Sequence, residues 1–203
     1  MPVKGRPRKF DKNKALDTAL RLFWKHGYEG VSISLLSREI GINTPSLYAA
    51  FGNKEALFLA AVKHYAAING NFYHEACAKK TAKEVARHIL ESEVKLVTMP
   101  DYPQGCLMIQ GALVTSPESE PIRKMMAEMR ATAEQWMAQR FRQAKMEGDL
   151  PESADAEILA CFLMTLNSGI AVQAKSGVSQ TKLLVLVDIA LSNWPDSTLK
   201  QKS

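Results

Sequence analysis

The sequence of 203 residues lacks the features of an extracellular or metal-binding protein. Its only cysteines, Cys77, Cys106 and Cys161, have no metal-site spacing and cannot all pair within one chain. Sparse cysteine of this kind is typical of a reducing compartment. No apolar run approaches the roughly 20 residues that a membrane-spanning helix needs, and the basic start of the chain leads into no apolar stretch. We therefore expect a globular cytoplasmic protein without a metal.

Motifs of catalysis are also missing. The four histidines form no HExxH pattern, no glycine-rich phosphate loop is present, and no serine stands in a nucleophile-elbow sequence. The sequence therefore predicts neither an enzyme nor a bound cofactor. An all-helical enzyme remains the alternative from another functional class.

Acidic residues are scarce in the first third of the chain. Up to Tyr65, 11 Lys and Arg stand against 5 Asp and Glu, a balance of +6, whereas the remainder has 15 against 16 and a balance of −1. The positive excess of the whole chain, +5, thus lies entirely before Tyr65. Such a segment suits the neutralisation of phosphates, although a merely basic surface would show the same imbalance.

Proline and glycine are sparse inside segments whose apolar residues recur three and four apart, and no strand pattern is convincing. We expect an all-α fold with an N-terminal three-helix helix-turn-helix domain and a C-terminal helical effector and dimerisation domain. The expected helices cover about 12–26, 34–40, 44–51, 54–70, 81–98, 106–115, 117–147, 154–175 and 179–194. The expected divisions are a basic arm at 1–10, a DNA-binding domain at 11–58, an effector and dimerisation domain at 59–195 and a tail at 196–203.

The segment 34–51 has the turn chemistry of a helix-turn-helix. Ser34 can cap the first helix, Gly41 tolerates a positive φ in the turn, and Asn43 can cap the second helix ahead of Pro45 in its first turn. An ordinary helical hairpin would satisfy the same spacing. The residues expected to face outward from the second helix, where they can enter a major groove, are Thr44, Pro45, Ser46, Tyr48 and Ala49.

Several features of residues 27–58 fall in one register: Gly27-Tyr28, Gly41-Ile42, Leu47-Tyr48, Phe51 and Lys54-Glu55-Ala56-Leu57. Together they closely resemble the DNA-binding domain of TetR-family transcriptional regulators. The resemblance implies that Tyr48 and Lys54 contact backbone phosphates, and that residues 44–49 read bases. It also implies that Ser32 and Ser34 lie near phosphate. Ser32 stands where the family more often has threonine, and Pro45 stands where it often has glycine, so the base preference stays open.

A basic arm precedes this segment. Its sequence, Lys4-Gly5-Arg6-Pro7-Arg8-Lys9, predicts a minor-groove hook, because arginines such as Arg6 and Arg8 are drawn to narrow A·T-rich minor grooves. A solvated tail that adds only general attraction for DNA is the alternative.

The last two expected helices, 154–175 and 179–194, are apolar over more than one face. By the family resemblance, these helices usually form a four-helix bundle with a partner subunit. A dimer would present two recognition helices about one helical turn of DNA apart, or a multiple of it, which predicts a roughly palindromic operator. The candidate interface residues are Leu163, Leu166, Ile170, Leu184, Val187 and Leu191.

Methionine is dense in the segments that would surround a ligand cavity. Because methionine adapts to irregular ligands, this density favours a pocket for a hydrophobic effector, but a plain apolar core would look the same. The candidate lining residues are Cys106, Met108, Gln110, Met125, Met129, Trp136, Phe162 and Asn167.

Cys106 lies in PDYPQGCLMIQGAL, which resembles a proline-rich loop and Gly-Cys-Leu start in a subset of the family that includes cysteine-based sensors of electrophiles or oxidants. A thiol at a helix N-terminus has its thiolate favoured by the helix dipole. The alternative is a buried cysteine that acts as a small apolar residue.

These observations predict a homodimeric regulator of transcription that binds double-stranded DNA and has no membrane partner. We expect a repressor that a small hydrophobic or electrophilic effector releases from a palindromic operator. The long helix that starts at Lys54 is expected to link the two domains. A DNA-binding adaptor or architectural protein without an effector is the alternative.

Overall fold

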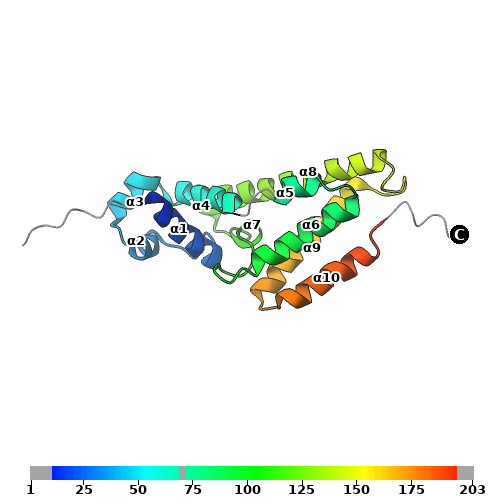
Figure 1. The fold of residues 1–203 in the computed structure, drawn as a ribbon. Helices are drawn as coiled ribbons and strands as arrows, with labels where there is room; N and C mark the ends of the chain where they lie inside the picture. Colours follow the sequence, from blue (N-terminus) through cyan, green and yellow to red (C-terminus); the bar gives the residue numbers. More distant parts are fainter. Residues whose placement is uncertain (1–10, 69–71, 196–203) are drawn as a thin grey trace, which may run out of the picture.

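A computed structural model describes residues 11–68 and 72–195. Within those residues the chain is helical and has no strand, which confirms the all-α fold. The helices are α1 Lys12–His26, α2 Ile33–Ile40, α3 Thr44–Phe51, α4 Lys54–Ile68, α5 Phe72–Cys77, α6 Ala82–Val97, α7 Leu107–Gln110, η1 Pro117–Ser119, α8 Glu120–Met146, α9 Ala156–Lys175 and α10 Gln180–Ser192. Figure 1 shows α1, α2 and α3 gathered at one end of an elongated molecule, with α6, α9 and α10 at the other.

The N-terminal helices form because each has its cap and an apolar side. The Asp11 carboxylate accepts from the backbone N–H groups of Asn13 and Lys14 at 3.0 and 3.1 Å, which satisfies donors at the start of α1. On its inner side Phe23 meets the ring of Phe58 edge-on, with centroids 5.1 Å apart. This contact holds α1 against α4. In turn, α2 packs against α1 and α3 packs against α4.

Two expected helices differ in the structure. The helix expected from Ser34 begins at Ile33, and its cap lies two residues before the expected one, because the Ser32 hydroxyl accepts from the backbone N–H of Leu35 at 3.1 Å. The prediction of a buried helix over 106–115 is wrong, since α7 ends at Gln110 and Val114 is 88% exposed. The sequence reading also missed α5, a six-residue helix that the expected span of α4 and the following loop concealed.

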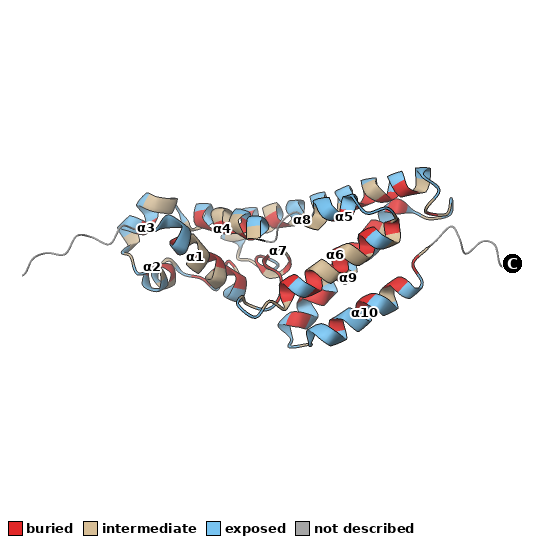
Figure 2. Cartoon of the chain, viewed as in Figure 1, coloured by how far each residue is buried: buried red, intermediate tan, exposed pale blue. Residues whose placement is uncertain are grey.

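The C-terminal helices pack in layers around α6 and α9. A capping box at Thr81 and Glu84 starts α6, and an ion pair from Arg87 to Asp188, 2.7 Å long, joins α6 to α10. By length and composition α9 is apolar enough to cross a membrane, contrary to the sequence expectation. In the structure its inner side packs against α6 and α8 (Figure 2 shows the buried inner surfaces in red).

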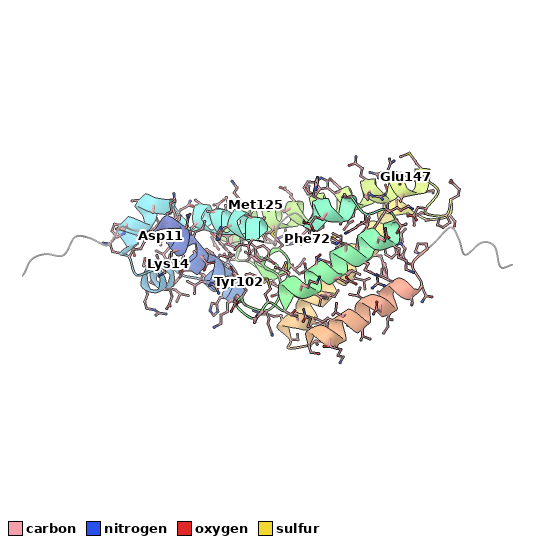
Figure 3. The ribbon with its side chains drawn as sticks, viewed as in Figure 1. Asp11, Lys14, Phe72, Tyr102, Met125 and Glu147 are labelled. Carbon is pink, nitrogen blue, oxygen red and sulfur yellow. The ribbon has the colours of Figure 1, made fainter. Side chains whose placement is uncertain are left out.

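The loop around α7 joins the two ends of the molecule. The indole N–H of Trp24 in α1 donates to the Gly105 carbonyl at 2.8 Å, and the Trp24 ring stacks on Tyr102 with centroids 5.3 Å apart (Tyr102 is labelled in Figure 3). Beyond α7, the backbone N–H of Tyr28 donates to the Gly111 carbonyl at 2.7 Å. The end of α1 and the loop after it are therefore joined, through Trp24 and Tyr28, to the residues on both sides of α7.

Candidate nucleic-acid interface and ligand cavity

The outer face of α3 is exposed to solvent. Gly41, with φ +79°, makes the turn before it, and the Asn43 carboxamide oxygen accepts from the backbone N–H of Ser46 at 2.9 Å. Leu47 is buried and anchors the helix, whereas Tyr48 is 47% exposed. The structure confirms the predicted turn at Gly41 and the predicted cap at Asn43, because caps and turns are local properties.

The remaining predicted DNA contacts divide into exposed and partly buried side chains. Pro45, Ser46 and Ala49 are exposed on α3. Thr44 is half-buried, and its hydroxyl lies 3.2 Å from that of Ser37 on α2, where it helps to hold the two helices together.

The start of α2 offers a second polar site beside α3. Ser32 and Ser34 are both exposed there, and their hydroxyl oxygens lie 2.8 Å apart. Arg6 and Arg8, the predicted minor-groove contacts, lie outside the described residues.

Lys54 is held in place at the first residue of α4. Its ammonium lies 4.2 Å from the centroid of the Tyr28 ring, a cation–π contact. Burial lowers the pKa of the Lys54 amine, and the nearby Glu29 carboxylate opposes that change. The Asn53 carboxamide caps the same helix end by accepting from the backbone N–H of Ala56 at 2.8 Å. A positioned cation at a helix start suits a phosphate contact.

A cavity of about 340 Å³ lies between the helices of the C-terminal part. Of the eight predicted lining residues, five line it: Cys106, Met108, Met129, Trp136 and Asn167. They come from α7 and its cap, α8 and α9. A larger hollow of about 800 Å³ runs along α8, but it is open to solvent and lined by Arg140, Arg142 and Lys145. The more enclosed, mostly apolar cavity is the better candidate for a small ligand.

Three predicted lining residues lie elsewhere. The Gln110 carboxamide donates to the Ala171 carbonyl at 3.1 Å and so joins α7 to α9. Met125, labelled in Figure 3, packs against the core outside the cavity wall. Phe162 is 43% exposed and lines a groove between α9 and α10. Helical spacing shows which side of a helix is apolar, but it does not show which neighbouring helix packs on that side.

Sequence reasoning missed the polar part of the cavity wall. Glu93 of α6 is only 1% exposed, and burial raises the pKa of its carboxyl to about 7. Tyr65, Tyr73 and Arg130 also line the cavity. A signal for Glu93 was present, because it stands in the apolar stripe of α6, four residues before the buried Val97.

Cys106 does not have the environment of a reactive thiolate. It is buried, and burial raises the pKa of its thiol well above the ordinary range, with the nearby Glu93 carboxyl adding to the rise. The hydroxyl of Tyr65 donates to its sulfur at 3.2 Å. Because α7 has a single turn, its dipole does not outweigh desolvation. Of the two interpretations of Cys106 that the sequence allows, the structure therefore supports the buried thiol and not the dipole-activated thiolate.

The predicted dimer contacts are mostly inside the protomer. Leu163, Ile170, Val187 and Leu191 are buried in the chain's own core, because α6, α9 and α10 pack on one another there. Leu166 is half-buried, and Leu184 is 36% exposed. The large apolar side chains that these two helices leave exposed are Ile158, Phe162, Val172, Leu184, Val185, Leu186 and Ile189.

No metal centre accompanies these sites in the part of the chain that the structure describes. Among those residues, no group of three His, Cys, Asp or Glu side chains lies close enough to hold a metal ion.

Comparison with known proteins places the whole chain among bacterial regulators. Residues 15–61 match the family model described as bacterial regulatory proteins, tetR family. Residues 84–183 match the tetracyclin repressor-like C-terminal domain. The HTH-type transcriptional repressor ComR of Escherichia coli K12 is 34% identical over 198 residues, covering 95% of this chain and 93% of ComR.

A solved relative is similar over nearly the same length. The TetR family transcriptional regulator CifR, as a cysteine mutant complexed with a 26-base-pair double-strand operator DNA, is 39% identical. The match has a TM-score of 0.87 and covers 94% of this chain and 100% of that one. The uncharacterized HTH-type regulator YezE of Bacillus subtilis is 30% identical, covering 93% of this chain and 98% of YezE.

Proposed function

The chain belongs to the TetR family of bacterial transcriptional regulators, and we propose that it is a homodimeric repressor that a small apolar effector releases from its operator. One observation carries the proposal most directly: a relative with the same fold over 94% of this chain binds operator DNA. The exposed outer face of α3 and the positioned Lys54 supply this chain's own surface for that role. A protein of this kind works where the chromosome lies, in the cytoplasm.

In this proposal α3 enters the major groove. Pro45 and Ala49 offer apolar contact to thymine methyl groups, and the Ser46 hydroxyl offers a hydrogen bond to a base edge. Tyr48 and Lys54 bind backbone phosphates on the flank of the groove. Together with the basic N-terminal part of the chain, these contacts predict a binding constant that falls steeply with salt.

The outer face of α9 and α10 is the proposed dimer interface. The exposed apolar side chains on these two helices make a patch that a soluble monomer rarely leaves in water. Burial against the same face of a second copy forms a closed, two-fold symmetric pair. The two α3 helices then enter successive major grooves on the same face of the DNA. This arrangement requires a roughly palindromic operator.

The structure offers a short route between the cavity and the helix-turn-helix. Cys106 and Met108 line the cavity, and the chain that continues from α7 accepts a hydrogen bond at Gly111 from the Tyr28 backbone. Farther along the same loop, the Ser116 backbone N–H donates to the Glu29 carboxylate at 2.9 Å. Tyr28 also carries the Lys54 ammonium on its ring. A ligand that shifts α7 therefore moves residues that hold a phosphate contact. The resulting change in the free energy of DNA binding is limited by the difference in the ligand's binding free energy between the shifted and unshifted conformations.

The enclosed cavity favours an effector-responsive repressor over an adaptor without a ligand. Burial of the Cys106 thiol favours an effector that binds without covalent reaction. Under this proposal Cys106→Ser still releases the operator in response to the effector. A variant that loses only its response to electrophiles would instead support covalent sensing.

Selection of bound fragments from the genomic DNA of the source organism tests the function. The full chain should enrich a small set of fragments that share two inverted half-sites. The variant Ala49→Glu, which places a carboxylate on the exposed face of α3, should enrich none of them. Equal recovery by both proteins would refute recognition through α3.

A further inference from the structure

The cavity contains two buried acceptor atoms that no protein group satisfies. In residues 11–68 and 72–195, the Glu93 Oε1 and Asn167 Oδ1 atoms are fully buried and have no hydrogen-bond partner. Both side chains line the cavity, Glu93 from α6 and Asn167 from α9. A buried polar atom without a partner costs free energy, so such atoms point to a missing group.

The two acceptors belong to one polar cluster. The Cys106 thiol and the Asn167 carboxamide N–H donate to the Glu93 carboxylate, and the Tyr65 hydroxyl donates to the Cys106 sulfur at 3.2 Å. The Glu93 carboxylate thus already accepts hydrogen bonds from Cys106 and Asn167, and its Oε1 atom still has no partner. Apart from Arg130 and Thr132, the remaining wall around the cluster is apolar or aromatic and includes Phe72 and Met164. The cluster therefore presents unsatisfied hydrogen-bond acceptors at one place on a mostly apolar surface.

We propose that the cavity binds a small, mainly apolar molecule that carries a hydroxyl or amino hydrogen-bond donor, with the donor placed against Glu93 and Asn167. This inference rests on the proposed function, because that molecule is the effector which releases the operator. It adds the chemical class of the effector. A donor fills the unmet acceptors, whereas an ether or hydrocarbon of the same shape leaves them buried and unsatisfied.

The other charged group on the wall does not favour an anion at this place. The Arg130 guanidinium donates to the Met108 carbonyl at 2.8 Å, which holds it against α7. A carboxylate ligand that reached Asn167 would meet the Glu93 carboxyl and add a second acid where donors are needed. A ligand carboxylate bound to Arg130 instead would bind without regard to Glu93, which separates the two cases by experiment.

The test compares hydroxyl compounds with ethers of similar shape that lack the hydrogen-bond donor. Three pairs are used on the full-length protein: 2-naphthol with 2-methoxynaphthalene, 4-butylphenol with 4-butylanisole, and 1-octanol with heptyl methyl ether. Dissociation constants are measured by isothermal titration calorimetry at pH 8, where the Glu93 carboxyl is ionised and accepts only, with 2-naphthoate as the anionic probe. We expect each alcohol to bind at least tenfold more tightly than its ether, since a hydrogen bond to a buried charged or polar acceptor commonly has about that effect.

Variants assign the preference to the cluster. Glu93→Leu removes the carboxylate and leaves the weaker neutral acceptor Asn167 Oδ1, so it should reduce the alcohol preference to less than threefold while the ethers bind at least as well. Glu93→Gln keeps an acceptor oxygen and should retain part of the preference. Glu91→Leu, the matched change at a surface site of α6 beside Arg87, should leave it unchanged. Circular dichroism and operator binding by Glu93→Leu establish that the variant is folded.

The outcomes separate the ligand class from the repressor function. Equal affinity of alcohols and ethers, tighter binding of 2-naphthoate, an unchanged preference in Glu93→Leu, or no binding by any pair would overturn the ligand class. Those results leave operator binding by the protein intact. Absence of operator binding with alcohol selectivity present would instead refute the proposed function and retain the cavity chemistry.

Discussion

Glu93 gives the protein a pH dependence that can be measured before its operator or effector is known. Burial raises the pKa of this carboxyl from the ordinary 4.5 to about 7, because the charged form loses its hydration inside the cavity wall. The groups that face it are the Cys106 thiol, the Tyr73 hydroxyl and the Asn167 amide. Burial also raises the pKa values of Cys106 and Tyr73, so both stay neutral below pH 8. Glu93 alone in this cluster titrates between pH 5 and 8.

The sign of the effect follows from where the proton resides. Between about pH 4.5 and pH 7 the folded protein keeps a proton on Glu93 that the unfolded chain has lost. Stability from this group is therefore fully present at low pH and falls as the pH rises through 7. At about 1.4 kcal/mol per pKa unit, the full loss is about 3 kcal/mol, of which about 2.5 kcal/mol develops between pH 5 and pH 8.

The perturbation is Glu93→Gln, which stays neutral at every pH and keeps the size of the side chain. Its stability advantage over the wild type should grow by about 2.5 kcal/mol between pH 5 and pH 8, or roughly 5–10 °C in Tm for a chain of this length. Urea unfolding at fixed protein concentration measures it, because dimer stability depends on concentration. Glu91→Gln, beside Arg87 at the surface of the same helix, is the control and should show no such growth. A Glu93→Gln advantage that is constant within 1 kcal/mol, or that shrinks with pH, would refute the reasoning about this cavity.

Four further predictions concern the DNA surface, the core and the dimer. Lys54→Ala should weaken operator binding about equally across sequences and reduce the slope of log affinity against log salt by about 1, measured by fluorescence anisotropy; an unchanged slope would remove Lys54 from the phosphate contacts. Deletion of residues 1–9 should also weaken binding and reduce the slope, and unchanged affinity at several salt concentrations would dispose of the minor-groove arm. Leu36→Ala, at a fully buried site, should cost about 2–5 kcal/mol in urea unfolding, and a cost below 1 kcal/mol would contradict the packing of α2. Ile189→Glu, at a site 62% exposed in the protomer, should shift the protein from dimer to monomer in sedimentation at micromolar concentration; a wild type that is itself monomeric would refute the interface on α9 and α10.

The helix-turn-helix was predictable from sequence because its signals are local. The Gly41 turn, the Asn43 cap and the family register of residues 27–58 each involve neighbours in the chain. Ser32 replaced the expected Ser34 as the cap of α2, an error of two residues. Both serines could accept from a backbone N–H, and only the three-dimensional path of the loop decides between them.

The cavity and the interface were less predictable because they depend on long-range packing. Phe162 and Leu191 carry equally apolar side chains on adjacent helices, but Phe162 is exposed and Leu191 is buried. Hydrophobicity marks both residues for burial, and the helix that covers each one is known only from the fold. Glu93 shows the reverse case, since a charge in an apolar stripe was visible in the sequence and signalled a polar group held in the interior.

The most direct test of the account measures operator affinity against affinity for random-sequence DNA of equal length. Fluorescence anisotropy at physiological salt should give at least about a thousandfold preference for a selected operator with inverted half-sites. Ala49→Glu should lower that preference to near unity while the protein remains folded and dimeric. A wild type that binds both DNAs equally, or an Ala49→Glu variant that keeps the full preference, would contradict sequence reading by α3.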